Sequence, residues 1–209
     1  MDNTVIVTAM SPVKTHDAAL ASRLVEEAAR IVTTEGIGAL TLRRLAGAGG
    51  TSTMAVYTLF GDKDGLLQAM HDEGFARLGA AMAAARDDSD DALTALARLG
   101  EAYRETAVAN PHLYMLMFGG AAPGFVPSPQ SQVAAEATFS PLVAAVQRCL
   151  DADELVGGTA EQIATFLWSV SHGVISLELT GKLATAAADA AAAYRDAMVF
   201  SVMPFLPRT

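Results

Sequence analysis

Residues 24–66, LVEEAARIVTTEGIGALTLRRLAGAGGTSTMAVYTLFGDKDGL, decide the fold of this chain. Their first part, together with the few residues before it, repeats apolar side chains every three or four positions. This spacing predicts an amphipathic helix over residues 16–34. Thr15 is the expected N-cap of that helix, and Gly36 is its expected stop.

Two short helices are predicted to follow. Thr41 is the expected cap of the second helix, and Ser52 is the expected cap of a third that ends at Phe60. Several glycines separate the two. Three helices, of which the last two are short and joined by a glycine turn, are typical of a helix-turn-helix DNA-binding unit. A fourth helix, capped by Asp62, is expected over residues 63–86.

The residue types in this stretch resemble those of the tetracycline-repressor (TetR) family of bacterial regulators. The matching positions are Ala28, Ala29, Gly36, Thr41, Arg43, Leu45, Ala46, Gly50, Ser52, Val56, Tyr57, Phe60, Lys63 and Leu66. So many typed positions at fixed spacing make the resemblance specific. Gly49 and Thr51 depart from it, since the family commonly has a helix former and an apolar residue there. The third helix is therefore expected to be set slightly differently.

The third helix is the expected recognition helix, because such a helix brings its first turn to the base edges in the major groove. Thr53 offers a hydrogen bond there, whereas Met54 and Ala55 offer methyl contacts and favour recognition by shape. The predicted DNA-binding residues are Thr41, Arg43, Arg44, Ser52, Thr53, Met54, Ala55, Tyr57, Thr58 and Lys63. Two alternatives stay open: Tyr57 is a core residue, and Arg44 is only solvated.

The net charge of −9 and the pI of about 4.8 argue at first against a polyanionic partner. The charge is unevenly distributed, however. Residues 1–63 carry equal numbers of cations and anions, so the excess of acidic groups belongs to the rest of the chain. The N-terminal part can therefore still present a local basic face to DNA.

The remainder of the chain is predicted to be helical as well. The expected helices lie near 90–109, 111–118, 132–151, 159–180 and 184–203, with one substantial Gly- and Pro-rich loop over 119–131. The expected fold class is therefore all-α, with a three-helix DNA-binding head and a larger helical bundle. The expected organisation is an N-terminal arm over 1–14, the DNA-binding domain over 15–63 and an effector-binding and dimerisation domain over 64–209.

This second part resembles the ligand-sensing domain of the Trp-His-Gly (WHG) subgroup of the family. Asn110-Pro111 and its neighbours carry one motif, and Trp168, His172 and Gly173 carry the other. Gly173 has no Cβ to hold another helix away. The predicted ligand-binding residues are Tyr103, Met115, Phe118, Phe125, Phe139, Trp168 and His172. A purely structural role stays open for His172 and for the methionines, which are common in ordinary cores.

Other classes of site find little support in the sequence. The single cysteine, Cys149, and four scattered histidines form no metal-binding pattern, and no phosphate-binding loop or nucleophile elbow occurs. We therefore expect no metal, no cofactor and no catalytic residue. The chain has neither a secretory signal pattern nor an apolar run of membrane-spanning length, which predicts a cytoplasmic protein.

The resemblance implies a homodimeric transcription regulator, most simply a repressor. It would bind a palindromic operator in double-stranded DNA and leave it when a small, apolar effector binds. Dimerisation is expected through the last two helices, and the fourth helix is the expected lever between the two parts. Three alternatives remain: an activator, a ligand-binding protein that has lost DNA binding, and a helical enzyme built around His172.

Overall fold

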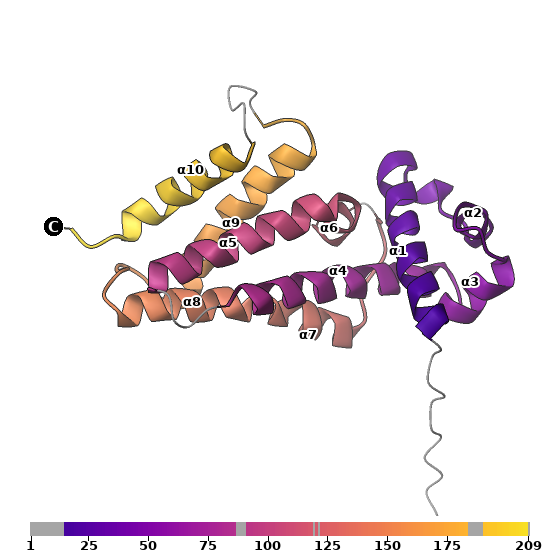
Figure 1. Cartoon of the computed structure of the whole chain (residues 1–209), viewed down its shortest axis with the longest axis horizontal. Coiled ribbons are helices and arrows are strands. Elements are labelled where there is room, and N and C mark those ends of the chain that lie inside the picture. The colour runs from indigo at the N-terminus through magenta and orange to yellow at the C-terminus, as the bar shows by residue number, and fades with distance from the viewer. Residues whose placement is uncertain (1–14, 87–90, 119, 121, 184–189, 209) are drawn as a thin grey trace, which may run out of the picture.

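The computed structural model of the chain describes residues 15–86, 91–118, 120, 122–183 and 190–208, and within them it contains helices and connecting turns but no strand. Figure 1 shows an elongated molecule with a small helical head at one end and a larger bundle at the other. One long helix, α4 (Lys63–Ala85), runs from the head into the bundle. The predicted all-α fold is confirmed. The predicted N-terminal arm lies outside the described residues.

The head has the predicted arrangement of one long and two short helices. These are α1 (Thr15–Glu35), α2 (Leu42–Ala48) and α3 (Thr53–Phe60), with a short 3-10 turn, η1 (Ile37–Ala39), after α1. The helix α1 begins at Thr15 itself, so the prediction of Thr15 as its cap was wrong. An N-cap residue has non-helical backbone angles, whereas Thr15 already belongs to the helix. Gly36 ends α1 with a φ of 85°, as predicted.

The two departures from the family pattern, Gly49 and Thr51, lie on either side of Gly50 in the turn between α2 and α3. Gly50 has a φ of 63°, which only glycine adopts without strain. A Cβ on Gly49 would overlap the side chain of Leu24 on α1. The glycine at 49 therefore lets the turn pack directly against α1, and a side chain there would require Leu24 to move.

The core of the head extends beyond its own three helices. Leu24, Leu45 and Val56 are fully buried in it. The same cluster includes Leu66, Leu67 and Met70 from the beginning of α4, and Leu113 and Leu116 from α6 (Pro111–Phe118). The head is therefore held to the bundle by shared apolar packing along two helices.

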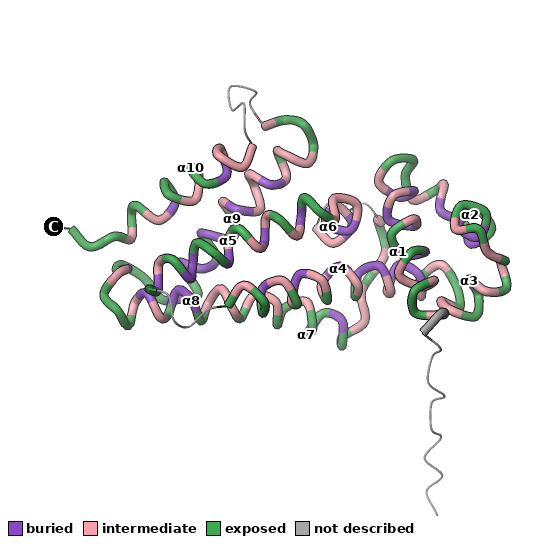
Figure 2. Tube along the Cα trace, in the orientation of Figure 1, coloured by how far each residue is buried: buried purple, intermediate pink, exposed green. Residues whose placement is uncertain are grey.

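The bundle surrounds a second apolar cluster. Its remaining helices are α5 (Ala92–Ala109), α7 (Pro129–Ala137), α8 (Ser140–Asp151), α9 (Ala160–Leu179) and α10 (Ala190–Val202), with a terminal 3-10 turn, η2 (Met203–Phe205). Figure 2 shows that buried residues run along α5, α8 and α9 on the inside of this bundle. The helices α9 and α10 pack along each other.

The predicted single helix over 132–151 is in fact two helices, α7 and α8. Pro141 lies in the first turn of α8, where it cannot donate the hydrogen bond that a continuous helix would need. The helix α7 also begins inside the predicted loop, because Ser128 caps it and Pro129 occupies its first turn. The predicted helix over 184–203 is shorter in the described residues, where α10 spans Ala190–Val202, and residues 184–189 fall outside them.

Candidate DNA-binding face and ligand cavities

The outer face of α3 presents large side chains to solvent. Met54 is 74% exposed and Tyr57 is 53% exposed, whereas Val56 between them is fully buried. Val56 anchors the helix to the head, so its neighbours necessarily point outward. The alternative that Tyr57 is a core residue is therefore wrong. An exposed methionine and an exposed tyrosine on one short helix are suited to contact a partner surface.

The two predicted cap residues are engaged with the backbone of the helices that they begin. The Thr41 side-chain oxygen accepts a hydrogen bond from the Arg44 N–H at 3.1 Å, and that of Ser52 accepts one from the Ala55 N–H at 3.1 Å. Thr58 donates its hydroxyl to the Met54 carbonyl at 2.9 Å. These polar groups orient α2 and α3, while Thr53 and Ala55 are half-exposed in the first turn of α3.

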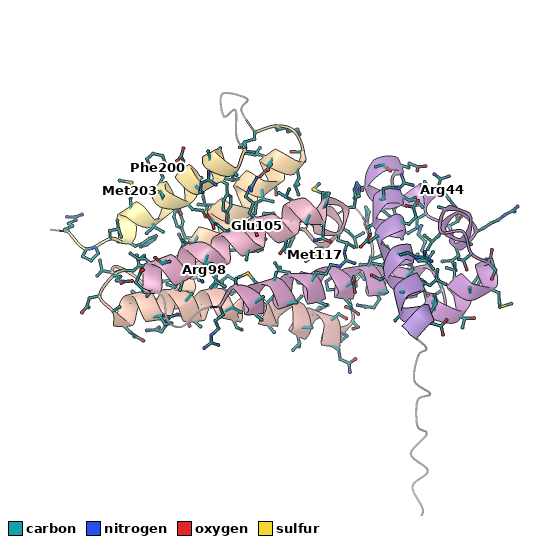
Figure 3. The ribbon with its side chains drawn as sticks, viewed as in Figure 1. Arg44, Arg98, Glu105, Met117, Phe200 and Met203 are labelled. Atoms are coloured by element: carbon teal, nitrogen blue, oxygen red, sulfur yellow. The ribbon has the colours of Figure 1, made fainter. Side chains whose placement is uncertain are left out.

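The cations of this face differ in what they contact. Arg43 is exposed and has no ionic partner within the described part of the chain. Arg44, which is labelled in Figure 3, pairs with both carboxylate oxygens of Glu35 at 2.6 Å. Lys63 donates its Nζ to the Ile37 carbonyl at 2.7 Å. Of these three cations, Arg43 is thus the one best available to a phosphate. The contacts of Arg44 and Lys63 are between separate segments of the head, which spacing in the sequence does not reveal.

Two apolar cavities lie side by side in the bundle. The α7 cavity, of about 400 Å³, lies between α4, α7, α8 and α9, and the α10 cavity, of about 430 Å³, lies between α5, α9 and α10. The α7 cavity is lined by Phe75, Leu78, Met82, Tyr103, Phe118, Ala135, Glu136, Thr138, Phe139, Leu142, Thr165 and Trp168. Tyr103 and Trp168 also line the α10 cavity, so their side chains stand between the two.

The structure brings four of the seven predicted ligand-binding residues together. Tyr103, Phe118, Phe139 and Trp168 line the α7 cavity, and the Phe139 and Trp168 rings meet edge to face at 6.0 Å between centroids. Met115, Phe125 and His172 line neither cavity.

Phe125 lies elsewhere because its loop carries it to the core of the head. It packs against that cluster, with its ring 6.2 Å from that of His71. Met115 is half-buried on α6 and belongs to neither apolar cluster. The aromatic types in the sequence indicated a cavity, but they did not reveal which aromatic residues reach it.

A chain of side-chain hydrogen bonds runs from the cavity wall through two buried tyrosines to half-buried residues of α9. Trp168 donates its Nε1–H to the Tyr103 hydroxyl at 3.1 Å, and the Tyr103 and Tyr114 hydroxyls lie 3.1 Å apart. The Tyr114 hydroxyl lies 2.6 Å from Nδ1 of His172, whose Nε2 lies 3.4 Å from Ser176 Oγ. These bonds favour the structural role for His172.

Burial determines which of these hydrogen-bonded side chains can be charged. It raises the pKa of both Tyr103 and Tyr114, so both phenols stay neutral, and it lowers the pKa of His172. The sequence did not single out Tyr114 as a candidate, although it lies in the Asn110-Pro111 motif. The place of this tyrosine in that motif was the available signal.

A third, more polar hollow of about 690 Å³ lies between α4 and α7 on the outside of the bundle. Gln68 on α4 donates to Ser131 Oγ at 2.6 Å and accepts from the Ser128 N–H at 2.8 Å. These bonds tie the beginning of α7 to α4. Neither a motif nor a spacing in the sequence indicated this hollow.

The helix α6 joins the head to the cavity side of the bundle. Its Leu113 and Leu116 pack in the core of the head, while Tyr114 and Phe118 pack in the core of the bundle. Figure 3 labels Met117 where α6 approaches α4. The helix α6 therefore contributes one face to the core of the head and another to the core of the bundle beside the α7 cavity.

Polar contacts of Arg77 on α4 reinforce this junction. Its guanidinium lies 2.8 Å from a carboxylate oxygen of Glu26 on α1 and donates to the Asn110 side chain at 2.6 Å. It also pairs with Glu73 on its own helix at 2.8 Å. The arginine thus connects α4 with α1 and with the residue that precedes α6.

The described residues hold no cluster of three or more metal-binding side chains. Across the same residues, none of the helices is both long and apolar enough to span a membrane.

Two family models match the chain. The model of bacterial regulatory proteins of the tetR family matches residues 24–70, and the tetracyclin repressor-like C-terminal domain matches residues 96–200. The first match covers the head and the beginning of α4, and the second covers most of the bundle. No curated protein is significantly similar to the chain.

Several solved structures are similar over nearly the whole chain. A Rhodococcus sp. RHA1 protein of unknown function is 28% identical, with a TM-score of 0.74, and the match covers 94% of this chain and 100% of that one. A tetR-family regulatory protein from Rhodococcus RHA1 is 20% identical, with a TM-score of 0.76 and 91% and 98% covered. PfmR, a TetR family transcriptional regulator from Thermus thermophilus, is 23% identical, with a TM-score of 0.70 and 89% and 100% covered. The last two matches support the fold alone.

Proposed function

Because the chain belongs to the TetR family of DNA-binding transcriptional regulators, we propose that it is a repressor that a small, mostly apolar effector releases from a palindromic operator. The observation that carries the proposal is the pairing of an exposed recognition helix with apolar cavities, connected by α6. We place the DNA-binding unit in residues 15–63 and the effector-binding and dimerisation unit in residues 64–209, in a protein of the WHG subgroup.

In the proposed complex, α3 enters the major groove. Met54 and Tyr57 have the exposure that base-edge and backbone contacts require. Arg43 contacts a phosphate directly, whereas Arg44 does so only by sharing its charge with Glu35. Thr41, Ser52 and Lys63 add contacts at helix ends, and Thr53, Ala55 and Thr58 lie along the groove-facing side of α3.

The proposed dimer is formed by α9 and α10. Along α9, Phe166 and Leu177 are each 44% exposed, and Gly173 between them faces open space within the protomer. On α10, Phe200 is 69% exposed, and Figure 3 shows it pointing away from the bundle. An apolar stripe with a glycine at its centre is suited to close packing against the same stripe of a second copy.

The proposed effector site consists of the two cavities and the residues that divide them. Their walls are almost entirely carbon, with Phe118, Phe139 and Trp168 as aromatic surfaces. Such a lining favours a molecule with a large apolar surface and few polar groups. In this proposal His172 supports the wall through Tyr114 and does not contact the effector.

We further propose that α6 and α4 act together as the connection between effector and DNA. An effector beside Phe118 shifts α6, and with it Leu113 and Leu116 in the core of the head. The two recognition helices of the dimer then no longer match successive major grooves. Linkage requires that DNA weaken effector binding by the same factor by which the effector weakens DNA binding.

The proposal is tested by measuring operator binding of the wild type and of the Arg43→Ala, Tyr57→Ala and Lys63→Ala variants. Each substitution is expected to weaken binding about fivefold or more, since each removes a contact to DNA. Val126→Ala is the matched control, because Val126 is 75% exposed and lies outside the head. Unchanged binding in the three variants would favour a protein of this fold that no longer reads DNA.

Reporter expression with and without the intact gene distinguishes a repressor from an activator. Expression that rises on deletion supports the repressor proposal, and expression that falls supports the activator. An effector that binds free and DNA-bound protein equally well would contradict the coupling through α6 and α4.

A further inference from the structure

The wall between the two cavities contains a single polar contact shared by both. Tyr103 and Trp168 line the α7 cavity and the α10 cavity, and the Trp168 Nε1–H donates to the Tyr103 hydroxyl at 3.1 Å. Because an indole N–H can only donate, the Tyr103 oxygen must accept this bond. This bond does not determine which group accepts the Tyr103 O–H.

One arrangement of hydrogens uses every donor in the chain. Tyr103 donates to Tyr114, Tyr114 donates to Nδ1 of His172, and the Nε2–H of His172 faces Ser176 Oγ. This arrangement leaves no buried hydroxyl hydrogen without a partner. It is the favoured arrangement when the cavities hold no hydrogen-bond acceptor.

The same heavy-atom positions allow the reverse arrangement. In that case Nδ1–H of His172 donates to Tyr114, and Tyr114 donates to Tyr103. The Tyr103 oxygen then accepts two hydrogen bonds, and its O–H is free to donate to a group outside this row of hydrogen bonds. His172 loses a proton at Nε2 and gains one at Nδ1 by exchange with water, so its charge does not change.

The other phenol that lines the α10 cavity, Tyr194, lacks this freedom. Tyr194 donates its hydroxyl to the Gly100 carbonyl at 2.7 Å, and Ser171 Oγ lies 2.9 Å from the same hydroxyl. A backbone carbonyl can only accept, so the Tyr194 hydrogen is committed. Tyr103 is therefore the phenol that can become a donor without breaking a bond to the backbone.

We propose that the effector is an apolar molecule that carries a carbonyl oxygen, and that the Tyr103 hydroxyl donates to this oxygen when the chain to His172 reverses. The inference rests on the proposed function, since it takes the cavities as the effector site. It adds a chemical class, ketones and esters in preference to pure hydrocarbons, and a specificity-determining residue, Tyr103.

The test uses a matched pair of probes, butyrophenone and butylbenzene, which differ only in a carbonyl in place of a methylene group. Trp168 is the only tryptophan of the chain, so its single indole N–H resonance reports binding at the shared wall. The ratio of the two dissociation constants is compared between proteins, because the different hydration of the probes cancels in that comparison.

Two variants are expected to differ in their effect on this ratio. Tyr103→Phe removes the donor and should lower the preference for the ketone about fivefold or more. Tyr114→Phe removes the acceptor that competes for the Tyr103 hydrogen, so the preference should be retained or increased. A merely structural role of the hydrogen-bond chain would lower ketone binding in both variants alike, and that result would overturn the proposal.

The nitrogen resonances of the His172 ring provide a second readout. Butyrophenone is expected to move the ring proton from Nε2 to Nδ1 in the wild type, whereas butylbenzene should not. An unchanged tautomer, or tighter binding of 1-phenylbutan-1-ol than of the ketone, would contradict the proposal. Binding of none of the probes would contradict the effector site itself, and operator affinity of the same samples shows whether the DNA-binding proposal stands.

Discussion

Gly65 lies in the first turn of α4, where the head joins the long helix. A Cβ at this position would run into the carbonyl oxygen of Phe60, which is a backbone atom and cannot move aside cheaply. The Gly65 N–H also donates a hydrogen bond at 2.8 Å to the side chain of Asp62, which caps the helix. The close approach of chain segments at this glycine therefore fixes how α3 leads into α4.

We expect Gly65→Ala to lower the free energy of unfolding by about 1–3 kcal/mol, because the added methyl group forces α3 and α4 apart. Denaturant unfolding measures the change. Gly38→Ala is the matched control, since a Cβ at Gly38 meets nothing within 4 Å. Equal stability of the two variants would contradict the steric role of Gly65.

The half-buried His172 gives the stability of the protein a pH dependence of known sign. Burial lowers its pKa in the folded protein, so the unfolded chain binds the proton more readily. The contribution of His172 to the free energy of unfolding is therefore complete above its unfolded pKa of about 6.5. It decreases as the pH falls from there toward the lower pKa of the folded state.

The wild type should accordingly lose more stability between pH 7.5 and pH 5.5 than His172→Gln, a variant that cannot titrate there; these pH values are about one unit either side of the ordinary histidine pKa. Thermal unfolding of both proteins across that range measures the difference. Parallel losses in the two proteins would contradict a lowered pKa of His172 in the folded protein.

At the scale of the elements, the junction between head and bundle depends on α4 and α6. Arg77 connects α4 with Glu26 on α1 and with Asn110 before α6. Its side chain is 26% exposed, so these contacts are only partly screened by water. Apolar packing of Leu113 and Leu116 supports the same junction from α6.

We predict that Arg77→Met, which keeps the apolar stem, destabilises the junction by about 1–2 kcal/mol, between the values for exposed and buried ion pairs. Amide hydrogen exchange should show faster opening of α1 than of α9. Arg43→Met serves as the control, because Arg43 has no ionic partner among the described residues. An equal increase of amide exchange in α1 and α9 of Arg77→Met would contradict a role of Arg77 that is confined to the junction.

The sequence predicted those elements whose signals are local. The caps at Thr41, Ser52 and Asp62 have side-chain oxygens and spacing that the structure confirms. The beginning of α7 was missed, because Ser128 and Pro129 belong equally well to a loop and to the beginning of a helix.

The cavities required tertiary information. Aromatic residues of the C-terminal part predicted an apolar site, and Trp168 and Phe139 do reach it. Phe125 does not, because a loop conformation places it against the head. Tyr114 supports the cavity wall through its hydroxyl contact with Tyr103 on another helix, which spacing along one helix does not indicate.

At the scale of the whole molecule, the exposed apolar side chains gather on α9 and α10. Figure 2 shows that α10 has much intermediate and exposed surface, and Val199, Phe200 and Met203 are each more than half exposed. Large exposed apolar patches mark interaction sites in soluble proteins. The proposed homodimer covers this surface and sets the distance between the two heads.

We expect Phe200→Glu to shift the protein from dimer to monomer at micromolar concentration, since the substitution places a charge within an apolar interface. Sedimentation equilibrium measures the change. Val133→Glu is the control, because Val133 is 66% exposed but lies on α7. A dimer that persists in Phe200→Glu would place the interface elsewhere.

The central claim is that the head reads DNA sequence, and selection of bound fragments from the genomic DNA of the source organism tests it most directly. We predict that the wild type enriches a few palindromic sites, that binding weakens steeply with rising salt, and that Tyr57→Ala loses the enrichment. No enrichment by the wild type at low salt, or the same enrichment by Tyr57→Ala, would contradict the account.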